Sequence, residues 1–265
     1  MYDFGYQRVS SVEEAAKLLA ADPEAKLLAG GQTLIPVLKQ RLNRPSTVID
    51  IAQTGLAGIK ADGTTVTIGA MTPHGAVAAS QDVRRLIPAL AELAGMIGDE
   101  QVRHRGTIGG SLANNDPAAD YPAAVLALNA TVRTQRRAIK ADDFFLGMFT
   151  TALEPDEIIT AVEFPAPEKA AYEKFRNPAS RYAMVGVFVA KLRDGGVRVA
   201  VTGAGQNGVF RHTAMEQALA SNLSPDAIAN VTTPASEMNS DIHGSAEYRA
   251  HLVGVMTKRA LAKLR

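Results

Sequence analysis

Two short glycine-rich segments carry the residues best suited to bind a ligand. The first reads Ala29-Gly30-Gly31-Gln32-Thr33, and the second reads Thr107-Ile108-Gly109-Gly110-Ser111. Because glycine has no Cβ, a glycine pair tolerates positive φ and can direct successive backbone N–H groups to one side of a turn. A hydroxyl-bearing residue follows each pair and adds a neutral donor. Two such turns facing each other would suit a diphosphate, whose charges need convergent donors, and this ligand class includes FAD.

The segment that follows the second glycine pair, residues 112–122, is rich in amides and carboxylates. Its polar members include Asn114, Asp116 and Asp120. Such side chains can bind the hydroxyl groups of a ribose or ribityl chain. The segment also allows a structural interpretation, in which Asp116 caps a helix that begins at Pro117. The two interpretations are compatible, with Asp120 reaching a ligand from one turn further on.

A third glycine motif, at residues 203–208, fits the dinucleotide-binding pattern G-x-G-x-x-G and follows an apolar strand. That fold requires a second strand ending in an acidic residue about 20 positions later, whereas this chain starts a helix near Ser224. We therefore interpret the motif as a turn between a strand and a helix. The five histidines have no metal-ligand spacing, and no G-x-S-x-G motif occurs, so neither metal nor hydrolytic chemistry is indicated.

The composition narrows the possible chemistry. The absence of cysteine excludes disulfides, zinc–thiolate sites and cysteine-ligated iron–sulfur clusters within the chain, so redox chemistry would require an organic cofactor. The 28 basic and 27 acidic residues give a net charge of +1, which does not favour nucleic-acid binding. No apolar run approaches the roughly 20 residues that span a bilayer, and the N-terminus lacks a signal pattern, so we expect a cytoplasmic protein without a membrane span.

The hydrophobic pattern predicts two lobes. The first ~50 residues form an α/β unit in which a strand leads into the first glycine turn and a helix follows it. Two prolines and three charges at 163–169 interrupt the strand pattern and predict a boundary there. The expected strands are at 25–28, 47–51, 58–60, 64–68, 130–134, 136–140, 157–164, 171–176, 184–193 and 197–203. The expected helices are at 11–21, 34–42, 73–79, 87–97, 117–128, 211–220, 224–230 and 245–264.

The two glycine segments and the sequence Asp116-Pro117-Ala118-Ala119-Asp120 together resemble a known family. It comprises the FAD-binding medium subunits of molybdenum hydroxylases, as in aerobic carbon monoxide dehydrogenase and bacterial xanthine dehydrogenase. The likeness covers nearly the whole chain and continues through residues 154–159, 172–175 and 241–249. One departure is a hairpin around Gln135 that looks shorter than usual.

The resemblance implies an α+β fold. A two-subdomain FAD-binding domain of the vanillyl-alcohol-oxidase (PCMH) type at 1–168, divided at about 55, would precede a smaller C-terminal lobe at 169–265. That lobe would contain a three-stranded antiparallel sheet and helices. By position in the family motifs, the implied FAD-binding residues are Lys26, Ala29, Gly30, Gly31, Gln32, Thr33, Leu34, Ile97, Thr107, Ile108, Gly109, Gly110, Ser111, Asn114, Asp120, Ile159, Lys174 and Tyr182. Tyr182 would lie by the isoalloxazine, with Lys174 as a nearby cation.

The resemblance also implies partners. A large subunit would carry a molybdopterin cofactor, and a small subunit with two [2Fe–2S] clusters would pass electrons to FAD, in a dimer of heterotrimers. FAD would then pass them to an external acceptor. No catalytic residue and no metal ligand is assigned to this chain itself. Two alternatives remain open: a stand-alone FAD-dependent reductase of the same fold, and a non-catalytic binding or assembly module.

Overall fold

The computed structural model, which describes residues 1–265, begins with a small parallel sheet and two helices. The strand order is β1 (Gly5–Arg8), β3 (Thr47–Asp50) and β2 (Lys26–Leu28). Helix α1 (Val12–Ala21) begins where predicted, because the Ser11 hydroxyl accepts a hydrogen bond from the Glu14 N–H at 3.1 Å. Strand β1 was not predicted from the sequence. All four of its residues are exposed, so it lacks the alternation that marks a half-buried strand.

The first glycine turn follows the carboxyl end of β2, as predicted. Helix α2 (Leu34–Lys39) comes directly after the turn. The predicted helix ran to residue 42, but the observed helix is shorter because Arg41 adopts a left-handed φ of 60°. The turn therefore stands between a strand end and a helix start, where free N–H groups gather.

The middle unit is built on a five-stranded antiparallel sheet. Its order is β4 (Ile59–Asp62), β5 (Thr65–Gly69), β10 (Ile159–Pro165), β6 (Thr131–Thr134) and β7 (Ala138–Lys140). The other elements of this unit are α3 (His74–Ala79), α4 (Gln81–Leu86), α5 (Pro88–Gly95), α6 (Glu100–Arg105), α7 (Ile108–Asn114), α8 (Tyr121–Ala127), α9 (Ala141–Phe144), β8 (Phe145–Gly147) and β9 (Thr150–Thr151). The apolar residues of the sheet and helices, together with several from the C-terminal lobe, form one cluster of 35 buried residues.

Two local predictions for this unit were wrong. The helix expected from Pro117 begins only at Tyr121. The Asp116 carboxylate accepts a hydrogen bond from the Ala118 N–H at 2.8 Å, so it closes a turn instead of capping the helix. In addition, the second glycine segment is not a simple turn, since it forms the first turn of α7.

The C-terminal lobe has three long antiparallel strands and one very short one. They are β11 (Lys169–Arg176), β12 (Ala183–Lys191), β13 (Val197–Thr202) and β14 (Phe210–Arg211), in that order. The predicted three-stranded sheet is therefore extended by a two-residue edge strand. The G-x-G-x-x-G segment connects β13 to β14, so a second strand, and not a helix, follows it directly. The remaining elements are α10 (Thr213–Leu219), the 3-10 turns at 225–228 and 235–237, and α11 (Ala246–Ala262).

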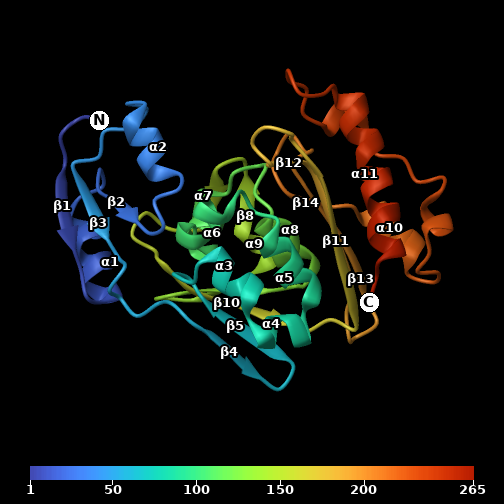
Figure 1. Ribbon diagram of the computed structural model, residues 1–265, viewed down its shortest axis with the longest axis horizontal. Coiled ribbons are helices and arrows are strands. Elements are labelled where there is room, and N and C mark those ends of the chain that lie inside the picture. Colours follow the sequence, from blue (N-terminus) through green and yellow to red (C-terminus); the bar gives the residue numbers. More distant parts are fainter.

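The C-terminal sheet is covered on both faces (Figure 1). Helices α10 and α11 pack on its outer face, while α5 and α8 of the middle unit pack on the other. Successive residues of β12 accordingly enter different cores: Val187 joins the outer cluster, and Phe188 joins the cluster of the middle unit. The period-two alternation of a strand explains this division. The middle unit and the C-terminal lobe thus share a core, whereas the N-terminal unit has a small cluster of its own.

Candidate functional site

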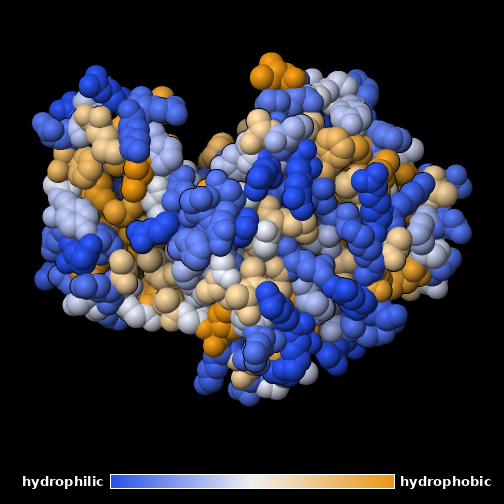
Figure 2. All heavy atoms as spheres, viewed as in Figure 1, coloured by the Kyte–Doolittle hydropathy of each residue, from blue (hydrophilic) through white to orange (hydrophobic).

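A cavity of about 500 Å³ lies between the N-terminal unit and the rest of the chain. Its wall is formed by the β2–α2 turn on one side and by residues from α3, α6, α7 and the 116–120 loop on the other. Figure 2 shows that the surface is notched between these two parts of the molecule. A volume of this size is within the range of small-molecule and cofactor sites.

Most of the predicted site residues lie on the wall of this cavity. They are Lys26, Ala29, Gly30, Gly31, Gln32, Thr33, Leu34, Ile97, Thr107, Gly109, Gly110, Ser111, Asn114, Asp120, Ile159 and Tyr182. Two predicted residues are not on the wall. The Ile108 side chain is fully buried in the core of the middle unit, and the Lys174 side chain is fully buried behind Asp120.

The first glycine turn keeps its donors free. None of the six backbone N–H groups from Ala29 to Leu34 finds a backbone acceptor within the chain. Gly31 has a φ of 74°, a left-handed conformation that glycine adopts without strain. Buried or partly buried N–H groups are normally paired, so a run of unpaired donors on a cavity wall is typical of an anion-binding site.

The second glycine turn differs from the expectation that both turns present free donors. The Gly109 N–H donates to the Ala70 carbonyl at 2.9 Å, and the Ile108 N–H donates to Thr72 at 3.2 Å. The Gly110 N–H donates to the Thr107 hydroxyl at 3.2 Å, which is the N-cap interaction of α7. Of the backbone donors in this turn, only the Thr107 N–H therefore has no acceptor within the chain. What it offers a ligand is a close main-chain surface, the Ser111 hydroxyl and the positive end of a short helix.

The two turns nevertheless meet in space. A Cβ added to Gly30 would lie 2.0 Å from the Arg105 carbonyl oxygen, so only glycine permits this contact with the backbone that leads into the second turn. A Cβ on Gly110 would lie 3.8 Å from the Cβ of Ala29. The two distant glycine segments therefore line one cavity, as expected, and most of the unpaired N–H groups belong to the first segment.

A buried polar cluster supports the floor of the cavity at Asp120. The Asp120 carboxylate accepts a hydrogen bond from the Tyr172 hydroxyl at 2.6 Å and is paired with the Lys174 ammonium at 2.9 Å. Lys174 also donates to the Met96 carbonyl at 3.2 Å. Burial raises the pKa of Asp120, while the charge of Lys174 and the hydrogen bond from Tyr172 act in the opposite direction. Lys174 thus fixes Asp120 in place and joins β11 to the end of α5.

Tyr182 lies at the open end of the cavity. It is 57% exposed and directly follows Arg181, whose φ is 62°. Partial burial raises the pKa of its phenol, and the carboxylates of Asp116 and Asp120 add to this effect. A smaller cavity of about 210 Å³ lies against the same side chain in the C-terminal lobe. Tyr182 is therefore the residue shared by both cavities.

Sequence reasoning missed a charged clamp behind one wall. The side chain of Glu157 is fully buried and lines the cavity. It accepts hydrogen bonds from Arg137 at 2.8 and 2.9 Å and from the Thr134 hydroxyl at 2.7 Å, and these contacts lower its pKa to about 2. The short hairpin contributes as well, because the Gln135 side chain accepts from the Ile158 N–H at 2.7 Å. The hairpin thus holds the 153–159 wall in place.

His74 is a second missed residue of the wall. It is the first residue of α3 and is only 5% exposed. A lone histidine in the sequence gave no signal of a ligand site, because it forms no motif with the other four. The cavity also includes apolar side chains that were not predicted, among them Met71, Val102 and Leu153.

Family models identify the whole chain. A model described as the FAD-binding domain in molybdopterin dehydrogenase matches residues 2–167, and one described as the CO dehydrogenase flavoprotein C-terminal domain matches residues 170–264. The chain belongs to the FAD-binding subunit family of molybdopterin dehydrogenases. The expected fold class, a FAD-binding domain followed by a smaller α+β lobe, is confirmed.

Individual members of the FAD-binding subunit family agree with this assignment over nearly their full length. The chain is 39% identical over 272 residues to the nicotine 6-hydroxylase medium subunit of Paenarthrobacter nicotinovorans, covering 97% of this chain and 96% of the relative. It is 36% identical over 274 residues to the carbon monoxide dehydrogenase medium chain of Hydrogenophaga pseudoflava, with the same coverage. A solved carbon monoxide dehydrogenase from that organism, which lacks the Mo-pyranopterin moiety of its molybdenum cofactor, matches with a TM-score of 0.88 at 37% identity, covering 98% and 96% of the two chains.

The cavity suits the cofactor of this FAD-binding family. FAD contains a diphosphate, which backbone N–H donors can bind, and the six residues whose N–H groups are unpaired in the first turn all line the cavity. The wall also offers apolar side chains such as Ile97 and Ile159, which can pack against a planar ring system. No helix in the structure combines the length and the apolar character needed to cross a lipid bilayer.

Proposed function

We propose that this FAD-binding subunit transfers electrons within a molybdenum hydroxylase complex. It would receive electrons from a small subunit with two [2Fe–2S] clusters, which in turn receives them from a large subunit with a molybdopterin cofactor. It would then deliver them to an external acceptor. The relatives named above are called medium subunit and medium chain, which supports an assembly with a larger and a smaller partner. We propose a dimer of heterotrimers as the complete assembly.

The observation that carries this proposal is the run of free N–H groups beside a cavity that contains no evident acid–base pair of its own. Bound FAD supplies the redox chemistry by accepting and releasing electrons. The protein's part is to bind and position the cofactor. The first glycine turn holds the diphosphate, and the second turn supports it through the Ser111 hydroxyl and the end of α7.

We further propose roles for the remaining predicted residues. Lys26, Leu34 and Asn114 would complete the diphosphate and sugar contacts, and Asp120, held by Lys174, would bind the polar chain of the cofactor. Ile97 and Ile159 would pack against the rings, and the exposed Tyr182 would lie beside the isoalloxazine, where an acceptor can approach. The FAD-binding domain would end at residue 168, with its two subdomains meeting near residue 55.

A charge substitution on the first turn tests the cofactor site. Gln32 is exposed and lines the cavity, whereas Gln40 is exposed at the C-terminal end of α2 and does not line the cavity. We expect Gln32→Glu to weaken FAD binding about 10- to 100-fold, because a carboxylate close to a diphosphate is repelled even at a partly solvated site. The matched variant Gln40→Glu should bind FAD as the wild type does. Equal affinities for the two variants would contradict a diphosphate at the first turn.

Assembly is tested separately by purification from the native source. Mass identification of two companion chains, together with molybdenum and iron analysis, would support the complex. Reduction of the bound FAD when the substrate of the large subunit is added would support electron transfer. A flavin-containing chain that purifies alone and reduces a substrate by itself would instead indicate a stand-alone reductase. A colourless chain that does not bind FAD would indicate a binding or assembly module.

A further inference from the structure

Only three buried side-chain polar atoms in the chain have no hydrogen-bond partner, and two of them belong to neighbouring side chains. They are His74 Nδ1 and Tyr121 Oη, the third being Arg249 Nε in the C-terminal lobe. The rings of His74 and Tyr121 have centroids 5.3 Å apart and are tilted by 54°. Buried polar groups are almost always paired, so unpaired polar atoms on two neighbouring side chains next to a cofactor cavity require an explanation.

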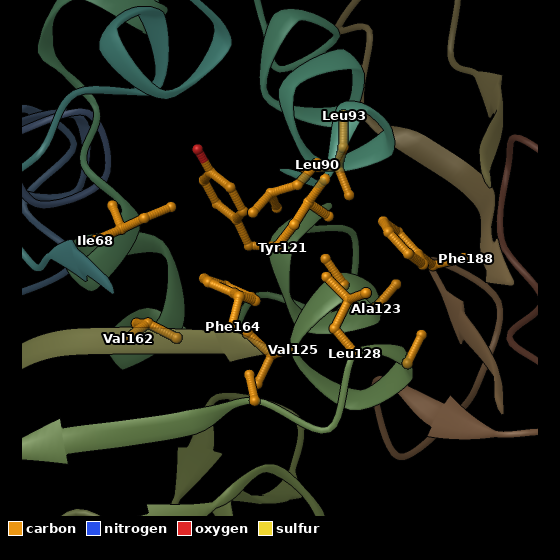
Figure 3. Packing of buried hydrophobic residues seen from close by; sticks show 14 of the residues in the cluster. Ile68, Leu90, Leu93, Tyr121, Ala123, Val125, Leu128, Val162, Phe164 and Phe188 are labelled. Atoms are coloured by element: carbon orange, nitrogen blue, oxygen red, sulfur yellow. The ribbon is translucent and has the colours of Figure 1, made fainter. Parts of the chain in front are cut away.

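The two residues connect the cavity wall to the protein interior. His74 lines the cavity, and its Nε2 edge lies against Gly106, where an added Cβ would be 2.6 Å from Nε2. Tyr121 is completely buried and directly follows Asp120. Figure 3 shows its hydroxyl pointing away from the apolar side chains that surround its ring. The imidazole therefore stands between the cavity and a buried hydroxyl.

The other buried histidine shows what a purely structural role looks like. Nδ1 of His212 accepts a hydrogen bond from the Met215 N–H at 3.3 Å, and Nε2 lies 3.0 Å from the Thr233 hydroxyl. Both ring nitrogens of His212 are thus satisfied within the protein, as expected for a helix cap. His74 has no such partners, although it is about equally buried.

We propose that His74 is a further FAD-binding residue and that Tyr121 positions it. The Tyr121 O–H donates to Nδ1 after a small rotation of the imidazole, which places the ring proton on Nε2. The Nε2–H then donates to a hydroxyl of the ribityl chain. This inference rests on FAD being the ligand of the 500 Å³ cavity.

A ribityl hydroxyl fits His74 better than a phosphate does. Burial and the nearby charge of Arg103 lower the pKa of His74 to about 4, so the imidazole is neutral at pH 7. A phosphate would favour a cationic partner, whereas a neutral N–H donor suits a hydroxyl. The position agrees with this choice, because His74 lies between Gly106, at the start of the second turn, and Tyr121, which follows Asp120.

The decisive test uses Tyr121→Phe, which removes a single buried atom. FAD affinity is measured by fluorescence titration of the full-length apoprotein, and the melting temperature is recorded with and without FAD. We expect the apoprotein to melt at the same or a higher temperature, because an unpaired buried hydroxyl is lost, while FAD binds about 3- to 10-fold more weakly.

Two variants at position 74 complete the test. His74→Leu should weaken FAD binding about 10-fold. The double variant that also carries Tyr121→Phe should bind FAD as tightly as His74→Leu does, because the two side chains act as one unit. His74→Gln places an amide N–H near the position of Nε2 and should recover much of the affinity. His212→Gln is the control: it should lower the melting temperature of the apoprotein and leave FAD affinity unchanged.

Two results would overturn the inference. One is a Tyr121→Phe apoprotein that melts at a lower temperature with unchanged FAD affinity, which would indicate a structural water between the two side chains. The other is wild-type affinity in His74→Leu. A wild-type chain that does not bind FAD would instead remove the basis of the proposed function, so the two failures are distinguishable.

Discussion

The two glycine turns are nearly alike in sequence and very different in hydrogen bonding. In the first turn, six consecutive N–H groups from Ala29 to Leu34 have no backbone acceptor. In the second, the N–H groups of Ile108, Gly109 and Gly110 are all paired. The first turn therefore offers unpaired N–H donors to a ligand. In the second turn, most N–H groups are already hydrogen-bonded within the protein.

The difference teaches that a glycine pair has two distinct uses. Gly31 provides a left-handed backbone conformation that opens the N–H groups, whereas Gly30 permits main-chain contact with Arg105. Gly109 resembles Gly30, since an added Cβ would lie 2.6 Å from the Cβ of Ala70. One glycine of the four is thus required by its dihedral angle, and two are required by close packing.

The largest expected effect concerns packing between the turns. Gly30→Ala would bring a Cβ against the Arg105 carbonyl, which cannot move without shifting α6, so we expect a loss of about 3 kcal/mol in the free energy of unfolding together with loss of FAD binding. In Gly110→Ala the added Cβ would lie 3.0 Å from the Thr107 hydroxyl oxygen, and alanine has the higher helix propensity. The free energy of unfolding should therefore change by less than about 1 kcal/mol. Urea unfolding of both variants checks this contrast, and equal losses would break the distinction between the two turns.

The sequence predicted which segments line the cavity but not the hydrogen bonds that each one makes. The distant glycine pairs, the strand before the first turn and the polar residue Asp120 could all be recognised from residue type and spacing. The hydrogen bond of the Gly109 N–H could not be predicted. Its acceptor is the backbone carbonyl of Ala70, and every residue has such a carbonyl whatever its side chain. Lys174 was expected as a cation near the flavin, whereas in the structure its side chain is buried against Asp120, 54 residues away in the sequence.

Other features could not be predicted because they depend on contacts between residues that are distant in the sequence. Strand β1 is entirely exposed and is held to β3 by strand pairing and by the Arg8–Asp50 ion pair, so it lacks a hydrophobic pattern. The role proposed for His74 depends on its contacts with Gly106 and Tyr121, which are distant in sequence. By contrast, β12 was predicted within one or two residues, because it is buried on both faces and reads as a continuous apolar run.

The Glu157–Arg137 clamp is another part of the cavity wall whose polar groups are paired within the protein. The pKa of Glu157 is lowered to about 2, so its contribution to stability is complete above the unfolded pKa near 4.5 and is lost as the pH falls towards 2. We expect Glu157→Gln to cost about 2 kcal/mol at pH 7, since one side of the pair is solvent-exposed, and to cost almost nothing near pH 2. Unfolding free energies measured between pH 2 and 7 test this. A pH-independent difference would mean that the carboxylate charge does not stabilise the wall.

The smallest expected effects concern Thr33, which precedes α2, and Thr107, which precedes α7. Thr33 is the N-cap residue of α2 but its side chain makes no capping hydrogen bond, whereas the Thr107 hydroxyl caps α7 by accepting from the Gly110 N–H. Thr107→Ala should therefore cost about 1 kcal/mol in the free energy of unfolding of the apoprotein. Thr33→Ala should cost less than about 0.5 kcal/mol but weaken FAD binding about 5-fold, because its hydroxyl is free to meet the ligand.

Chemical unfolding of the apoproteins, combined with FAD titration, separates these two roles. If Thr33→Ala destabilises the apoprotein as much as Thr107→Ala does, then the Thr33 hydroxyl caps α2 in the apoprotein and is not free for the ligand. If only FAD affinity responds to Thr33, the open turn is reserved for the ligand. The two hydroxyls then divide between stability and binding in the same way as the two sets of N–H groups.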